Sequence, residues 1–475
     1  MNAIQFIAKN IGFLGISSVI TSISGFFILI NIARYLGEVE FGKYSFAMSF
    51  TSLFIVFANL GLNNLIILLI ATDRELIREY ITSILVIKIP LSFLTFGFIV
   101  VSINLLNYPR DITYIVYIYG IYMILNSFVI IFRSIFQACE MMKYDAIIAI
   151  IDKLSLLSFI FAAIHLGCNL IELAYVYVLT GTASLALSAI IVMIKIAKPM
   201  PRINLSLWKC LIIGSTPFAL NALFGILFFQ IDTVMLSILK DDATVGIYNA
   251  AYTPLLALGI VPSVLIAGIY PVMSRLFVSS NKSLDALTEF AFRYMAIIGF
   301  PVAIGCFVLA DRFIELIYAG QFSASIIAFR ILVFFIPLRW ISSVTGTLLT
   351  STNKQGLRTL SVGLGSFLNI ILNLAMIPQL GYIGASIATV LSELFLYFAF
   401  TYSINKYYKD LRLGIHTIKP FIASLIMALF VLVLSHVNLV LLIVSAGIVY
   451  FIALILLKTF TEDDKSMFKY LAGKG

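Results

Sequence analysis

The sequence predicts an all-α protein that crosses a membrane about fourteen times, and its composition and hydropathy pattern give the reason. Hydrophobic residues make up 62% of the 475 residues, and charged residues make up only 11%. Soluble globular domains average roughly 45–50% apolar and about 25% charged residues, so no water-soluble fold would bury this apolar surface. We therefore expect a polytopic membrane protein with short connections and no separate soluble domain.

The predicted spans follow one another along the chain with only short polar connections. The first comes after nine residues that carry a single lysine and is longer than the core of a signal peptide, so we expect a retained helix. Each later span is identified as a stretch of roughly 20 mostly apolar residues. In chain order the spans are expected near residues 10–34, 43–71, 80–105, 112–137, 145–166, 170–196, 209–239, 245–275, 285–310, 324–350, 357–378, 381–405, 416–436 and 438–459.

Two short passages mark the same place in two halves of the chain. FGKYSFAMSF (41–50) and VGIYNAAYTP (245–254) both read Gly-x-Tyr and then small and apolar residues. Each lies where one span has ended and the next begins. We therefore expect the glycine to allow a tight reversal and the tyrosine to lie at the level of the lipid headgroups. A Leu-Gly pair at 166–167 and again at 380–381 supports a repeat of six spans.

The repeat predicts two pseudo-symmetric six-helix lobes around a central cleft. Six is an even number, so both copies enter the membrane from the same side. We divide the chain into an N-lobe (1–200), a C-lobe (201–410), and a C-terminal helix pair with a cytoplasmic tail (411–475). Prolines within spans predict bends, mostly in the C-lobe. They are Pro90 in the N-lobe and Pro217, Pro254, Pro262, Pro301 and Pro337 in the C-lobe.

The net charge of +9 arises from the connections on one side of the predicted membrane. Of the 31 lysines and arginines, 22 fall in the N-terminus, the even-numbered connections and the C-terminus, and 5 fall in the odd-numbered connections. By the positive-inside rule both termini are cytoplasmic. This placement argues against a nucleic-acid partner.

Four cations fall inside predicted spans: Lys88, Lys153, Arg330 and Arg339. An ionised side chain at mid-bilayer costs about 2.5–3.5 kcal/mol, so each must be paired, reach the interface or face a watery cleft. We predict that these four, with Arg34 at the end of the first span, form a cationic substrate-binding cleft. Arg34 either reaches the mouth of the cleft or anchors its helix. Arg330 and Arg339 face opposite sides of one helix unless Pro337 breaks it.

Acidic and amide side chains inside the spans are the other candidates for function. Asp232 and Glu393 are candidates for a coupling proton or sodium ion, and a structural ion pair with an arginine is the competing interpretation. Asn369 and Asn373 share a helix face with Ser366. This polar face either holds helices together or lines a wet cavity. Tyr119 and Tyr122 lie deep in their span and are candidates for stacking on sugar rings.

Catalytic and metal-binding signatures are missing from the sequence. The four cysteines are far apart, the three histidines lie near span ends, and there is no P-loop, GxSxG or HExxH. We therefore expect a non-enzymatic protein with no catalytic residue, no metal site and no cofactor, apart from a coupling ion.

Three stretches resemble a known family: ARYLGEVEFGKYSFAMS (33–49), FFQIDTVMLSILKDDATVGIYNAAY (228–252) and LNIILNLAMIPQLGYIGASIATVLSE (368–393). They look like the signature stretches of Wzx-like polysaccharide repeat-unit flippases, a branch of the multidrug/oligosaccharidyl-lipid/polysaccharide exporter superfamily. The resemblance covers the first twelve spans, and Arg34 matches the arginine of the family's first-span motif.

The resemblance implies alternating access in a bacterial cytoplasmic (inner) membrane. The implied substrate is an undecaprenyl-diphosphate-linked oligosaccharide unit for O antigen or capsule, a lipopolysaccharide or capsular precursor moved to the outer leaflet. A polysaccharide polymerase and chain-length machinery are the implied protein partners. A hydrophilic head cannot cross hydrocarbon unaided, whereas its polyprenyl tail never needs to leave it. A multidrug/cation antiporter is the first alternative, and a membrane glycosyltransferase or polysaccharide polymerase is the second.

Overall fold

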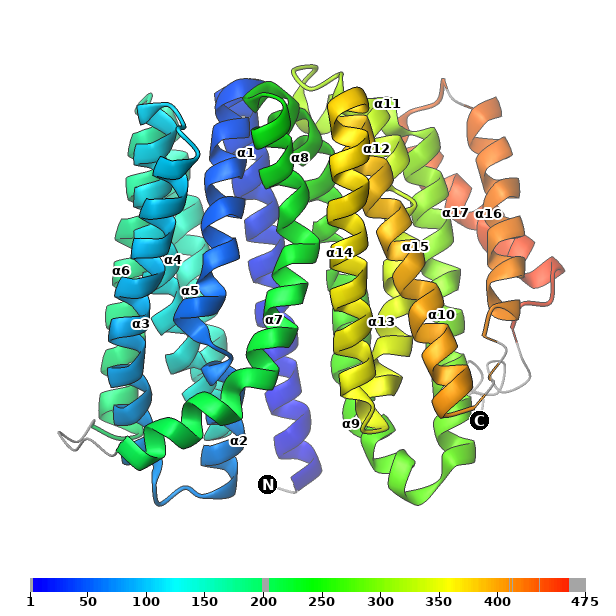
Figure 1. Ribbon diagram of the computed structural model, residues 1–475. Coiled ribbons are helices and arrows are strands. Elements are labelled where there is room, and N and C mark those ends of the chain that lie inside the picture. Colours follow the sequence, from blue (N-terminus) through cyan, green and yellow to red (C-terminus); the bar gives the residue numbers. More distant parts are fainter. Residues whose placement is uncertain (1–2, 199–204, 410, 412, 435, 461–475) are drawn as a thin grey trace. The chain divides into compact units, whose positions relative to one another are not determined.

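The computed structural model describes residues 3–198, 205–409, 411, 413–434 and 436–460, and within these ranges it is helical with no strand. Thirteen helical segments in these ranges are long and apolar enough to cross a membrane. The first, Gly12–Thr72, has 61 residues and contains both of the first two predicted spans. The predicted all-α polytopic fold is therefore confirmed (Figure 1).

The helices in chain order are α1 (Ala3–Asn59), α2 (Leu62–Thr72), α3 (Ile77–Leu105), α4 (Arg110–Ala138), α5 (Met142–His165), α6 (Leu170–Lys195), α7 (Leu205–Leu239), α8 (Asp242–Ala257), α9 (Ile260–Ser279), α10 (Asn281–Val308), α11 (Ala310–Tyr318), α12 (Ser325–Leu332), α13 (Phe335–Ser351), α14 (Gln355–Leu380), α15 (Tyr382–Tyr407), α16 (Ile415–Val433) and α17 (Leu439–Leu456).

The chain packs as two compact units. Unit 1 contains residues 1–260 and 362–385, and unit 2 contains residues 261–361 and 386–475. These units group helices by packing, whereas the predicted lobes group them by sequence repetition. The predicted lobes therefore stay a prediction, and their first boundary, at residue 200, lies outside the described residues.

Helix α1 contains the first reversal of the chain. Gly37 has a φ of 70° and a ψ of −177°, which interrupts the helix. In Figure 1 the chain rises from the N-terminus and turns back at the top within α1. In the second copy the corresponding turn lies at Lys240 and Asp241, between α7 and α8. The prediction that Gly42 and Gly246 make these turns is wrong, because both lie inside helices.

Gly42 and Gly246 instead allow α1 and α8 to cross in backbone contact. A Cβ atom on Gly42 would lie 1.8 Å from the backbone oxygen of Asp242, and one on Gly246 would lie 1.9 Å from that of Glu38. Asp242 lies four residues before Gly246, and Glu38 lies four residues before Gly42, so the contact is reciprocal. Any side chain larger than hydrogen would force the two helices apart.

The tyrosines of the two passages are buried rather than placed among lipid headgroups. Tyr44 is 3% exposed and Tyr248 is fully buried. The Tyr44 hydroxyl lies 2.8 Å from that of Tyr177, and the Tyr248 hydroxyl donates to Asp232 Oδ2 at 2.8 Å. Both tyrosines therefore form hydrogen bonds inside unit 1, next to the glycine crossing.

Two predicted spans are broken where proline removes a backbone donor. Helix α8 ends at Ala257 and α9 begins at Ile260, and Pro262 cannot donate to the carbonyl of Leu258. Helix α12 ends at Leu332 and α13 begins at Phe335, and Pro337 cannot donate to Val333. The helix is therefore broken between Arg330 and Arg339, a possibility that the sequence left open.

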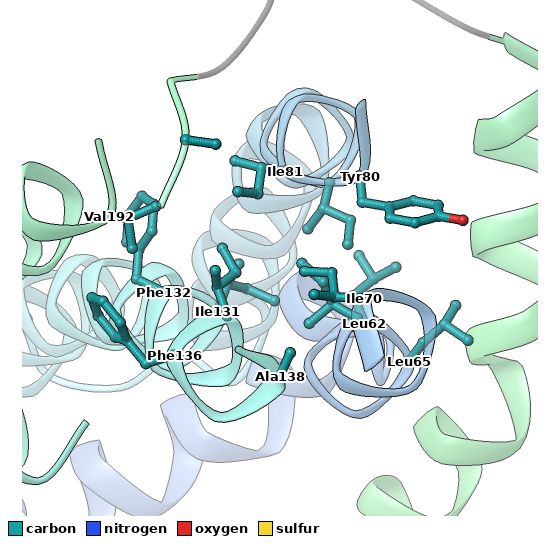
Figure 2. Packing of buried hydrophobic residues seen from close by; sticks show 14 of the residues in the cluster. Leu62, Leu65, Ile70, Tyr80, Ile81, Ile131, Phe132, Phe136, Ala138 and Val192 are labelled. Atoms are coloured by element: carbon teal, nitrogen blue, oxygen red, sulfur yellow. The ribbon is translucent and has the colours of Figure 1, made fainter. Parts of the chain in front are cut away.

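One aliphatic core holds α2, α3 and α4 together at the end of unit 1 opposite the glycine crossing. Figure 2 shows Leu62 and Ile70 of α2, Ile81 of α3, and Ile131 and Ala138 of α4 packed side by side. This core fixes α2 directly after the second break in the chain, at Leu60 and Gly61, where both residues have positive φ.

We expect Gly42→Ala and Gly246→Ala each to lower the free energy of unfolding by about 2 kcal/mol or more, because overpacked sites cost about 1–3 kcal/mol and here the obstacle is backbone. The measurement is the thermal unfolding midpoint of the purified protein in detergent. Gly225→Ala in α7 is the control, because nothing lies within 4 Å of a Cβ placed there. Equal midpoints for all three variants would contradict the crossing.

Candidate functional site

Lys88 is fully buried and holds the end of a helix. Its Nζ donates to the backbone oxygen of Ala58 and to Asn59 Oδ1, both at 2.9 Å, and lies 5.1 Å from the centre of the Phe128 ring. The last carbonyls of a helix lack partners and carry partial negative charge. Lys88 therefore caps α1 where the chain breaks before α2. The predicted placement of Lys88 in an open cleft does not match this burial.

Lys153 is partly exposed beside an acid on its own helix. Its Nζ lies 3.9 Å from Asp152 Oδ2, and Asp152 Oδ1 accepts a hydrogen bond of 2.6 Å from Ser184. An ion pair of this length contributes little, since exposed pairs contribute about 0–1 kcal/mol. Lys153 can therefore turn toward another anion.

Arg34 and Arg330 lie toward the ends of their predicted spans. Arg34 is exposed in α1. Arg330 Nη2 lies 2.5 Å from Asp311 Oδ2, and both side chains are exposed. Arg330 also lines a groove of about 380 Å³ in unit 2 whose other walls are apolar. Arg330 is therefore paired with an acid of the neighbouring connection.

Arg339 and Glu393 come together in unit 2. Arg339 Nη1 lies 3.6 Å from Glu393 Oε2, which is an ion pair too long for a hydrogen bond. Arg339 is 34% exposed, whereas Glu393 is 0% exposed. From the sequence we predicted Arg339 as a cation of the cleft and Glu393 as a candidate for ion coupling or for a structural ion pair. The structure makes them partners.

Asp232 is the centre of a buried polar network in unit 1. It accepts hydrogen bonds from the Tyr248 hydroxyl and from Asn373 Nδ2, and Asn373 Nδ2 also donates to Asn369 Oδ1 at 3.0 Å. Ser366 Oγ donates to the backbone oxygen of Phe224 at 2.9 Å. These bonds join α14 to α7, as expected for side chains that hold helices together.

The four side chains predicted to contact the glycan are all buried: Asn369, Asn373, Tyr119 and Tyr122. Both asparagines are fully buried in the Asp232 network. Tyr119 and Tyr122 are buried too, and both rings pack against the ring of Tyr177, with centroids 5.4 and 5.2 Å apart. Glycan contact by these four side chains stays a prediction.

Three charged residues escaped the sequence prediction. Arg358 of α14 donates to Thr350 Oγ1 at 3.1 Å in unit 2. Asp145 of α5 is buried and accepts hydrogen bonds from Arg133 and, at 2.8 Å, from Gln137. All lie near the ends of predicted spans, and nothing in the sequence distinguishes them from residues of the connections.

The oxygen-rich Asp232 network is the part of the site that fits a bound ion. Asn373 Oδ1 is buried and accepts no hydrogen bond within the described ranges. Such a group can accept from water or bind a cation. The residues described contain no cluster of three or more histidine, cysteine or acidic side chains for a transition metal. Binding of a proton or a sodium ion by this network stays a prediction.

The comparisons relate the chain to proteins of polysaccharide biosynthesis. A family described as "Polysaccharide biosynthesis protein" matches residues 7–277. An uncharacterized membrane protein of Methanocaldococcus jannaschii, MJ1068, is 24% identical over 70% of this chain and 67% of its own length. The probable flippase AglR of Haloferax volcanii is 28% identical over 34% of this chain and 35% of its own length. The chain thus aligns with only about a third of AglR.

Two solved structures share the fold. Lipid II flippase MurJ in an inward closed conformation superposes with a TM-score of 0.75 at 15% identity, covering 93% of this chain and 98% of MurJ. An inward-facing multidrug resistance transporter of the MATE family of the MOP superfamily superposes with a TM-score of 0.62 at 14% identity, covering 83% and 95%. At these identities the likeness shows the fold alone, and it confirms the fold that the resemblance implied.

We expect Lys88→Met to destabilise the protein by about 1–3 kcal/mol, because it leaves buried acceptors at the end of α1 without a donor. The measurement is the thermal unfolding midpoint in detergent. Lys354→Met, at an exposed turn of unit 2, is the matched control and should shift it by less than about 0.5 kcal/mol. A Lys88→Met protein as stable as this control would contradict the capping role and support the predicted role of Lys88 in the cleft.

Proposed function

We propose that this chain, which belongs to the polysaccharide biosynthesis protein family, is a flippase that moves a lipid-linked oligosaccharide between membrane leaflets. The family match over 271 of 475 residues is the observation that carries this proposal. The fold shared with MurJ and the alignment with AglR support transport rather than catalysis.

The charged side chains suit the head of such a substrate. A diphosphate needs cationic donors when it leaves water, and guanidinium groups pair with phosphate oxygens in two-point hydrogen bonds. The side chains of Arg339 and Lys153 are both 34% exposed and can be reached by a ligand, so they are our candidates for this role. Lys88 is not among our candidates because it is buried and two of its three ammonium donors bond the end of α1.

The finer parts of the proposal concern the carrier and direction. The substrate is an undecaprenyl-diphosphate-linked repeat unit of O antigen or capsule, delivered from the cytoplasmic to the outer leaflet of the bacterial inner membrane. Both termini are cytoplasmic, and alternating access presents the head to each side in turn. The polymerase and chain-length machinery receive the product. An ion gradient acts through Asp232 or Glu393, which are both fully buried.

A multidrug/cation antiporter is the second candidate, favoured by the fold shared with the MATE transporter. It requires an acid-dominated site. The partly exposed charge next to Glu393 is Arg339, which favours an anionic substrate.

Deletion of the gene followed by complementation tests the proposal. A flippase restores surface glycan and removes the accumulated lipid-linked intermediate. Drug resistance without any effect on that intermediate identifies an antiporter. Loss of the intermediate itself, instead of its accumulation, identifies a glycosyltransferase.

We expect Arg339→Gln and Lys153→Gln each to slow transport at least about tenfold, since a hydrogen bond to a charged group contributes about 1.5–3 kcal/mol. The readout is surface glycan at equal amounts of inserted protein. Lys354→Gln removes one exposed positive charge from unit 2 and should transport normally. Normal glycan from both site variants would show that these cations do not bind the head.

A further inference from the structure

Helices α13, α14 and α15 bring two arginines and one glutamate together in unit 2. Arg339 Nη1 lies 3.6 Å from Glu393 Oε2, and Arg358 is held by a 3.1 Å hydrogen bond to Thr350 Oγ1. A Cβ atom on Gly346 of α13 would lie 3.4 Å from Arg358 Nε, so Arg358 packs against the helix that carries Arg339. The cluster therefore carries one more positive than negative charge.

Glu393 is enclosed by protein and, among the described residues, forms an ion pair with Arg339. It is 0% exposed, and neither carboxylate oxygen accepts a hydrogen bond from any described residue. Asp232 is equally buried, but it accepts hydrogen bonds from Tyr248 and Asn373. A buried carboxylate without donors is stable as an anion only while a cation faces it. The charge of Glu393 therefore depends on Arg339.

Arg339 can be reached by a ligand, whereas Glu393 cannot. The arginine side chain is 34% exposed and the glutamate is fully enclosed. An incoming phosphate would thus meet the guanidinium first, and two phosphate oxygens bind a guanidinium better than one carboxylate oxygen at 3.6 Å. Arg358 adds a second positive charge that the carboxylate does not neutralise.

We propose that Arg339 and Glu393 form an exchange site, in which a lipid diphosphate replaces Glu393 as the partner of Arg339 and Glu393 binds a proton at the same time. When a lipid diphosphate pairs with Arg339, Glu393 loses its counter-ion and takes one proton from water to become a neutral acid. When the diphosphate leaves, Glu393 releases that proton and pairs with Arg339 again. No covalent bond to the substrate forms or breaks, and one proton is bound for each substrate bound. This inference rests on the proposed function for its substrate class.

Among the described residues, Arg339 is the cation that faces Glu393. Arg339 of α13 is the charged partner acting on the carboxylate. Arg358 of α14 acts on Arg339, and Tyr270 of α9 acts on Arg358. On α15 itself, Ser392 donates its hydroxyl to the backbone oxygen of Ala388 at 2.7 Å instead of to Glu393. A proton is therefore the remaining compensation when Arg339 turns away.

Binding of farnesyl diphosphate to the purified full-length protein, measured by calorimetry at about pH 7 and about pH 9, tests the exchange. One proton taken up per ligand makes the dissociation constant rise up to about tenfold per pH unit. Glu393→Gln, which resembles the protonated acid, should bind at both pH values as tightly as the wild type does at the lower one. The ligand's own ionisation is the same for both proteins.

Two control variants separate the exchange from general charge effects. Glu315→Gln removes an exposed carboxylate from α11 and should keep the wild-type pH dependence. Arg339→Gln should weaken binding at least about tenfold at both pH values. Equal pH dependence in the wild type and Glu393→Gln, or no binding by the wild type at either pH, overturns the proposal.

Flipping of the lipid-linked glycan by wild-type protein in liposomes is measured in parallel. Flipping without proton-linked diphosphate binding removes the exchange site and keeps the proposed function. Proton-linked binding without flipping keeps the exchange site and overturns the proposed function.

Discussion

The crossing of α1 and α8 at Gly42 and Gly246 is the constraint on which the interior of unit 1 depends. Each glycine lies against a backbone carbonyl of the other helix, so their separation is set by the peptide groups themselves. Two residues after each glycine a tyrosine enters the interior, where one bonds Tyr177 and the other Asp232. The position of the Asp232 network, and through Asn373 that of α14, therefore follows from a contact that admits no side chain.

The buried charged residues differ in whether they find hydrogen-bond partners within the protein. Hydrocarbon offers no water, so an unpaired polar group is costly and must find a partner within the protein. Lys88 finds two acceptors at a helix end, and Asp232 finds two donors. Glu393 has only a distant arginine. Lys88 and Asp232, whose hydrogen bonds are satisfied, are fixed parts of the fold. Glu393, which lacks hydrogen-bond donors among the described residues, can change its charge.

The sequence predicted what depends on local chemistry and failed where partners come from distant helices. Apolar length gave the spans, and Pro337 gave the break between Arg330 and Arg339. The role of Gly42 was missed because its neighbour is 200 residues away along the chain. Lys88 read as a cleft cation because its partner carbonyl belongs to another helix. Arg358 looked like any basic residue at a span end, and only packing places it near Arg339.

The exchange at Glu393 also bears on how an inside-negative membrane potential acts on transport. A diphosphate diester carries about two negative charges, and the proton on Glu393 cancels one, so the loaded site has about one more negative charge than the empty site. Each charge moved across 100 mV corresponds to about 2.3 kcal/mol. The potential therefore favours carrying the loaded head outward. Return of the empty site, with Arg339 and Glu393 paired, is electrically neutral at this pair. A protein with a permanently charged carboxylate there would move the same substrate with two charges uncompensated and lose the link between substrate release and proton release.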